Sequence, residues 1–146
     1  MTVTKRLRGL PIERTLDVIS GRWKAVIVHV LLSGPKRTCE LENHIRGITQ
    51  KVLIQQLRAL EEHGLVERQV RADEAQRVDY GLTPLGLSLQ PVIAMLEDWG
   101  RHHAEGLGET DQLLPCEAVV QDTPGKGTKP RLNLSDAAPV GEKIAE

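Results

Sequence analysis

The sequence predicts a mainly α-helical fold with one small β-hairpin (α+β), and three observations carry this prediction. Apolar residues recur at helical spacing over most of residues 11–63. Between residues 65 and 82 the spacing changes to the alternation of two short strands around a polar turn. Helical spacing returns over residues 84–103. The chain has no Phe, two Trp and one Tyr, so we expect a core built from Leu, Val and Ile.

The first two predicted helices form the start of this fold. The first begins at Pro11, whose fixed φ suits the first helical turn, and ends at Gly21. Its apolar stripe consists of Ile12, Leu16 and Ile19. The second helix, from about 22 to 32, is apolar around most of its circumference, which predicts a buried central helix. Gly34 and Pro35 end it.

A third, short helix is predicted over about 38–45, with Thr38 as a candidate N-cap, and a fourth follows over 49–63. Thr49 is a candidate N-cap of the fourth helix, since its hydroxyl can accept a bond from a first-turn amide. Gly64 stands where a left-handed residue commonly ends a helix. The inward face consists of Leu53, Leu57 and Leu60.

The opposite side of helix 49–63 carries amides and cations, with no acidic residue before Glu61. Its members are Gln50, Lys51, Gln55 and Arg58. Gln can bond adenine edges, Arg can bond guanine and Lys can neutralise phosphate. This side therefore suits a DNA groove, and the alternative is an ordinary surface helix with a polar outer face.

Two predicted strands, 65–70 and 77–82, surround a polar tip, and Val78, Tyr80 and Leu82 share one face of the second strand. Arg71 and Arg77 flank the tip, where they are candidates for phosphate or minor-groove contact. The alternative is that they pair with nearby acidic groups. Those groups are Asp73, Glu74 and Asp79.

The last predicted helix, 84–103, begins with Thr83 as N-cap and Pro84 at the first helical position. Its apolar residues follow the spacing of a coiled-coil seam: Leu85, Leu89, Val92, Leu96 and Trp99. Pro91 is expected to interrupt and bend this helix. The seam could pack on its own domain or on a second subunit, and the small core favours the second subunit.

Charge and composition divide the chain into a basic segment (1–10), one domain (11–103) and a Pro/Gly-containing acidic tail (104–146) that we expect to be flexible. Residues 1–60 carry eleven Lys or Arg against four Asp or Glu, whereas residues 104–146 carry four against eight. A cationic front half is typical of proteins that contact phosphates.

The order of three helices, a turn, a further helix and a hairpin is that of a winged helix-turn-helix, in which the hairpin forms the wing. Six stretches together resemble the HxlR-type family of bacterial transcription regulators. They are PIERTLDVISGRWK (11–24), GPKR (34–37), ITQKVL (48–53), LRALEEHGLV (57–66), RVDYGLT (77–83) and DWG (98–100). The resemblance implies a homodimer joined through its first and last helices, a roughly palindromic double-stranded DNA operator, and repression or activation of nearby genes.

Two sets of residues follow from this interpretation. The expected DNA-binding residues are Lys36, Arg37, Thr49, Gln50, Lys51, Gln55, Arg58, Arg71 and Arg77. The expected dimer interface comprises Ile12, Leu16, Leu89, Val92, Leu96 and Trp99. The chain departs from the family at Leu10, where several members place a redox-sensing Cys, so thiol sensing is not expected at this position. It also has Ala75-Gln76 where members often carry wing prolines, and Thr38 in place of the usual aromatic.

The sequence gives little indication of a metal site, a disulfide framework or a catalytic site. Cys39 and Cys116 form no zinc motif, and we expect neither a disulfide framework nor a metal site. Cys39 is a candidate thiol sensor, although a packing role is more common for a free Cys. No signal peptide or membrane-length apolar run is found, which favours the cytoplasm, and no catalytic arrangement suggests an enzyme or a cofactor.

Two questions stay open at this stage. A pocket between the core and the dimer helices could hold a small-molecule effector, but no residue pattern identifies it. The alternative function is a winged-helix protein-interaction module without DNA binding, which the acidic wing tip and the acidic tail would suit.

Overall fold

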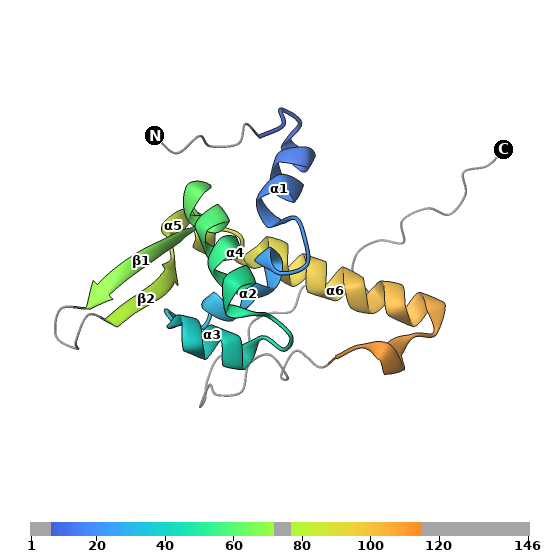
Figure 1. Ribbon diagram of the computed structural model, residues 1–146. Helices are drawn as coiled ribbons and strands as arrows, with labels where there is room; N and C mark the ends of the chain where they lie inside the picture. The colour runs from blue at the N-terminus through green and yellow to red at the C-terminus, as the bar shows by residue number, and fades with distance from the viewer. Residues whose placement is uncertain (1–6, 72–76, 115–146) are drawn as a thin grey trace.

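The structure is a computed structural model that describes residues 7–71 and 77–114. Its helices are α1 (Pro11–Ile19), α2 (Lys24–Leu31), α3 (Thr38–His44), α4 (Gln50–Glu62), α5 (Pro84–Leu87), α6 (Gln90–Leu107) and the 3₁₀ helix η1 (Thr110–Gln112). Strands β1 (Val66–Arg71) and β2 (Arg77–Leu82) form an antiparallel hairpin. The hairpin projects from one end of the molecule and α6 extends towards the other (Figure 1). The predicted fold class, mainly α with one hairpin, is confirmed.

Helix α2 is the centre of the core. Ile27, Val28 and Val30 are fully enclosed, and α2 contacts α1, α3, α4, α6 and β2. A helix that is apolar on nearly all sides must be covered on nearly all sides, which explains why the other elements gather around it. The prediction of a buried central helix is confirmed.

Helices α3 and α4 form the helix-turn-helix pair, and they pack on α2 through a continuous apolar face. The fully or almost fully buried members of this face are Leu41, Ile45, Leu53, Leu57 and Leu60. Removing the side chain of such a Leu generally costs about 2–5 kcal/mol, because the surrounding structure collapses only partly into the cavity. This face therefore fixes the orientation of α4 and leaves its opposite side directed away from the core.

The prediction that Thr38 caps α3 is wrong. The N-cap is Arg37, and Thr38 is the first helical residue. The backbone N–H of Arg37 donates a hydrogen bond of 2.9 Å to the carboxylate of Glu40. A Glu three residues after the cap can reach back to the cap amide, and this local bond sets where the helix begins.

The hairpin is joined to the rest of the fold along β2. Lys36 forms a bridge with Tyr80 through two backbone hydrogen bonds of 2.9 and 2.8 Å. Tyr80 and Leu82 pack against the core, but Val78 is exposed nearer the tip, because the hairpin there extends beyond the helices. The expected wing tip, with Asp73, Glu74, Ala75 and Gln76, lies outside the described residues.

The single helix predicted over 84–103 is in fact two helices. Thr83 caps α5 as expected, since its hydroxyl oxygen accepts a bond of 3.0 Å from the N–H of Gly86. Ser88 and Leu89 form a turn between the two helices, and α6 begins at Gln90. Pro91 lies in the first turn of α6, where its missing N–H costs no helical bond. The expected interruption of the helix is therefore present, but it lies just before Pro91 and separates two helices.

Helix α6 also continues past the predicted end at residue 103. It ends at Leu107, and Gly108 follows with a φ of 69°, the left-handed geometry that commonly closes a helix. The short η1 follows at once. Residues 104–114 thus begin the expected tail with ordered helical structure, and the remainder of that tail lies outside the described residues.

Candidate nucleic-acid interface

The polar side of α4 is formed by the local features that the sequence predicts. The Thr49 hydroxyl accepts a bond of 3.3 Å from the N–H of Val52, which caps the first turn. Gly64 ends the helix with a φ of 75°. Between these two signals the side opposite the buried Leu residues is exposed. It carries Gln50, Lys51, Gln55 and Arg58, all of which are exposed together with Thr49.

This polar side carries positive charge without neutralising partners. Neither Lys51 nor Arg58 forms an ion pair with any residue in the described ranges. A guanidinium can donate two bonds to a guanine edge, an amide can pair with adenine, and an ammonium group can neutralise a phosphate. The polar side of α4 therefore has the chemistry of a major-groove reading surface, and the core contacts no part of it.

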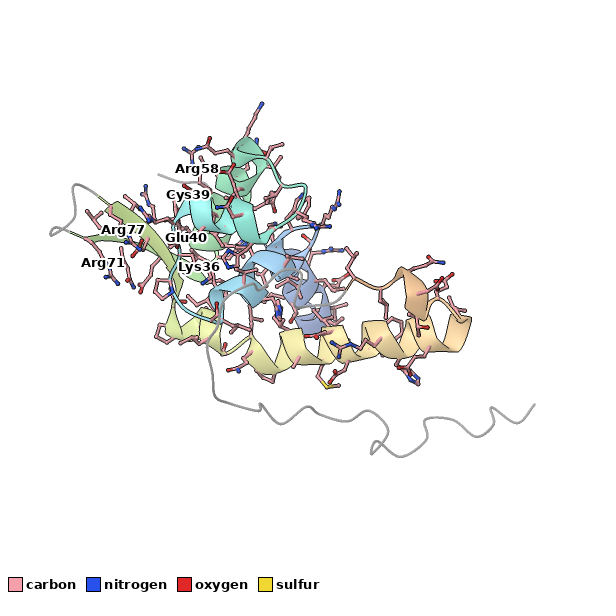
Figure 2. All side chains as sticks on the ribbon, turned by 90° about the horizontal axis from the view of Figure 1, so that it is seen from below. Lys36, Cys39, Glu40, Arg58, Arg71 and Arg77 are labelled. Atoms are coloured by element: carbon pink, nitrogen blue, oxygen red, sulfur yellow. The ribbon has the colours of Figure 1, made fainter. Side chains whose placement is uncertain are left out.

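The residues expected to contact the DNA backbone near α3 lie at its N-terminus. Lys36 is half-buried because its backbone pairs with β2. Arg37 is exposed, and its Nε lies 3.7 Å from a carboxylate oxygen of Glu40, a weak and solvent-screened pair. Figure 2 shows the labelled side chains of α3, α4 and the hairpin on the side of the molecule away from α6.

The two hairpin arginines share one acidic partner. The Nε of Arg71 lies 3.1 Å from Oδ2 of Asp79, and the Nε of Arg77 lies 2.9 Å from Oδ1 of the same carboxylate. The alternative of pairing with a nearby acid is therefore what the structure shows for both, with Asp79 as the acid. Arg71 remains exposed and Arg77 is half-buried.

Sequence reasoning missed two features of this interface. Asp79 is 1% exposed, but its alternation in β2 gave no reason to expect a buried acid. The guanidinium carbon of Arg22 lies 4.3 Å from the ring centroid of Trp23, a cation–π contact. Trp23 in turn reaches Gly47, in the turn before α4. The adjacency of Arg22 and Trp23 in the sequence was the available signal, but it does not reveal that the pair lies beside this turn.

The residues expected in a dimer interface divide into two groups. Ile12 and Trp99 are 77% and 58% exposed, and Leu16 and Leu96 are also exposed. Leu89 is only 9% exposed and belongs to the protomer's own core, so its assignment to the interface is corrected. It is buried because α5 and α6 meet at this residue. Val92 is half-buried against the same core.

Cys39 is exposed on α3, in contrast to the usual packing role of a free Cys, and Cys116 lies outside the described residues. Within the described ranges, no group of His, Cys, Asp and Glu is arranged to hold a metal ion. No helix in this part of the chain has the length and apolarity needed to cross a bilayer.

Comparisons with known proteins agree with this geometry. The model of the family of HxlR-like helix-turn-helix proteins matches residues 18–107. The uncharacterized HTH-type transcriptional regulator YkvN of Bacillus subtilis (strain 168) is 47% identical over 93 residues, which are 64% of this chain and 79% of YkvN. YtcD of the same organism, also an uncharacterized HTH-type transcriptional regulator, is 41% identical over 119 residues, 81% of this chain and 94% of YtcD.

The solved structures give the same fold. The redox regulator HypR in its reduced form superposes with a TM-score of 0.63 at 38% sequence identity, covering 67% of this chain and 97% of HypR. The family match over residues 18–107 includes the helix-turn-helix, the hairpin and all of α6. The chain belongs to the HxlR-like family of helix-turn-helix transcriptional regulators, and it is a winged-helix DNA-binding regulator.

Proposed function

We propose that this regulator binds a pseudo-palindromic operator as a homodimer, with α4 of each protomer in a major groove. The observation that carries the proposal is the exposed polar side of α4, with Lys51 and Arg58 unpaired among the described residues. Arg58 and Gln55 would contact base edges, and Lys51 a phosphate. Lys36 and Arg37 would touch the DNA backbone beside α3.

Dimerisation would use the exposed apolar residues of α1 and α6. Ile12, Leu16, Leu96 and Trp99 are large apolar side chains left uncovered by the protomer's own core. Contiguous exposed apolar surface commonly marks a protein–protein contact. A two-fold dimer would present its two α4 helices to half-sites about 34–36 Å apart, one turn of the duplex, or a multiple of that distance.

The proposal is tested by a mobility-shift assay with the intergenic DNA next to the gene, repeated over a series of salt concentrations. We expect one specific shift whose affinity falls steeply with salt, because each phosphate contact adds about 0.9 to the slope of log affinity against log salt concentration. Absence of any shift at low salt would contradict the proposal. It would instead favour the protein-interaction module, which the named transcription regulators among the relatives do not support.

Three further points belong to this proposal. We infer that the protein acts in the cytoplasm, where its operator would be, and that it is not an enzyme. Leu10 carries no thiol, so redox regulation of the kind suggested by the description of HypR would require another residue in this chain.

A further inference from the structure

The hairpin contains a buried carboxylate between two cations. Asp79 is the buried charged residue among the described positions, at 1% exposed. In the register of the hairpin, Arg71 lies directly opposite Arg77, and Asp79 follows Arg77 by two positions on the same strand. Figure 2 shows both arginines on the hairpin, next to the tip. Like charges directly opposite each other on two strands destabilise a hairpin, so this pair of arginines needs a neighbouring anion.

The geometry of the two contacts does more than neutralise charge. The Nε of Arg77 donates a hydrogen bond of 2.9 Å to Oδ1 of the carboxylate, and the Nε of Arg71 forms an ion pair with Oδ2 at 3.1 Å. A guanidinium is planar, so a bond at Nε fixes the direction of its remaining donors. A bond to a carboxylate is charge-assisted and therefore holds that direction firmly. Because Asp79 is itself enclosed by protein, both arginines are held from a rigid position.

We propose that Asp79 is a positioning residue that orients the guanidinium groups of Arg71 and Arg77 for the phosphates or the minor groove next to the wing. The inference rests on the proposed function, since it concerns the same DNA contact. In this interpretation, pairing with Asp79 orients the guanidinium groups of the two arginines before DNA binds. The summed charge of the three groups is +1, a sign that favours contact with phosphate.

The direction in which Asp79→Asn changes DNA affinity distinguishes a positioning role of Asp79 from simple charge neutralisation. Asp79→Asn removes a negative charge from a surface that meets DNA, so on charge alone it should tighten binding. If Asp79 orients the arginines, the same change should weaken specific binding, because two guanidinium groups lose their fixed direction. Glu67→Gln is the matched control: Glu67 lies on β1, it accepts a hydrogen bond from Gln69, and no arginine within residues 7–71 and 77–114 pairs with it.

The experiment measures operator affinity over a salt series for the full chain and for three variants: Asp79→Asn, Glu67→Gln and the double variant Arg71→Lys/Arg77→Lys. We expect Asp79→Asn to weaken specific binding roughly tenfold, within the range for one lost directed contact. The salt slope should fall by up to about 2 if both phosphate contacts are lost. Glu67→Gln should bind as tightly as the parent or slightly more tightly.

A coupling measurement shows whether Asp79 acts through the arginines. In the Arg71→Lys/Arg77→Lys background, the further change Asp79→Asn should cause no additional loss, because residues that act as a unit are not additive. Thermal denaturation monitored by circular dichroism identifies a variant that fails to fold. In that event the lysine double variant alone tests the inference, since it keeps both charges but removes the planar forks, and it should still lose affinity.

The outcomes are distinct. If the parent chain binds no operator, the proposed function fails and this inference fails with it. If the parent binds and Asp79→Asn binds equally well or better, only the positioning role is overturned. An equal loss of affinity on adding Asp79→Asn to the lysine background would also overturn it, because the effect would then not pass through the arginines.

Discussion

Arg58 is the side chain on α4 whose chemistry is most specific, because only a guanidinium can donate two parallel bonds to a guanine edge. It is exposed and has no ion-pair partner in the described ranges, so no internal bond has to be broken before it binds DNA. Gln55 lies on the same polar side and can contact adenine in the same manner. The sequence specificity of the protein is therefore expected to depend on very few side chains.

Replacing Arg58 by Ala is expected to cost about 1–3 kcal/mol in specific binding, with relaxed preference at the base pair it contacts. Operator affinity at fixed salt, compared with affinity for unrelated DNA, measures both effects. Arg101→Ala is a control that removes the same charge from α6 and not from α4, and it should leave the preference unchanged. Equal operator affinity for the parent and Arg58→Ala would mean that Arg58 does not contact a base.

Residue roles that depend on local spacing could be predicted, and those that depend on cross-strand pairing could not. The three Leu residues of α4 are buried and Arg58 is exposed because a helix repeats every few residues. The burial of Asp79 depends on the hairpin register, which brings Arg71 and Arg77 together so that both pair with its carboxylate. The sequence offered several possible acidic partners without ranking them.

The elements that orient the interface are fixed by a few local bonds and one close approach. Thr49 caps α4, and Thr83 caps α5 while also donating a bond of 2.6 Å to the carbonyl oxygen of Gly64. Thr83 thus ties the end of the α4 segment to the start of α5. Gly86 packs so closely on the backbone of Leu65 that a Cβ at this residue would be 2.1 Å from the carbonyl oxygen of Leu65.

Two glycine substitutions are expected to have opposite effects on stability. Gly86→Ala should lower the free energy of unfolding by at least about 1–3 kcal/mol, because the methyl group would collide with backbone that cannot move aside easily. Gly106→Ala, in α6 with nothing within 4 Å of the added atom, should raise it by roughly 0.5–1 kcal/mol. Urea denaturation of both variants measures the difference, and equal stabilities would contradict the packing of α5 on Leu65.

The cap of α4 can be separated from its DNA contact. Thr49→Ala should lower the free energy of unfolding by about 1 kcal/mol, since the first-turn amide of Val52 loses its acceptor. Thr49→Ser keeps the hydroxyl and should be nearly as stable as the parent. Urea denaturation in the absence of DNA is the measurement, and an unchanged stability of Thr49→Ala would show that the cap contributes nothing.

At the scale of elements, local start and stop signals predicted α4 well but did not predict the division of the last helix. Helix α4 has both a cap and a terminal glycine, and its bounds agree with the prediction within one residue. Pro91 lies in the first turn of α6 and marks the start of this helix, whereas the sequence pattern placed it inside one longer helix. Leu89, at the break, is buried in the core, and such a tertiary contact cannot be inferred from local spacing.

The whole molecule places its polar side and its apolar surface on different parts of the fold. The labelled side chains of α3, α4 and the hairpin lie away from α6, whereas α1 and α6 carry the exposed Ile12, Leu16, Leu96 and Trp99 (Figures 1 and 2). A dimer formed through α1 and α6 would leave both α4 helices accessible. That arrangement is what a two-fold symmetric operator requires.

A charge introduced into the proposed dimer surface should produce monomers. Leu96→Glu places a carboxylate where a second subunit would bury it, and an unpaired buried charge is strongly unfavourable. Val70→Glu is the control, since Val70 is also an exposed apolar residue but lies on the hairpin. Analytical ultracentrifugation should find a dimer for the parent and Val70→Glu and a monomer for Leu96→Glu. A parent chain that is monomeric at micromolar concentration would contradict the dimer.

The central claim, that the polar side of α4 reads bases in a symmetric operator, is tested most directly by selecting binding sites from a pool of random duplexes. The parent protein should select an inverted repeat with half-sites one duplex turn apart or a multiple of it. Arg58→Ala should select the same repeat with the preference lost at one symmetric pair of positions. Selection of an identical site by the parent and by a variant lacking both Gln55 and Arg58, or selection of no site by the parent, would contradict the account.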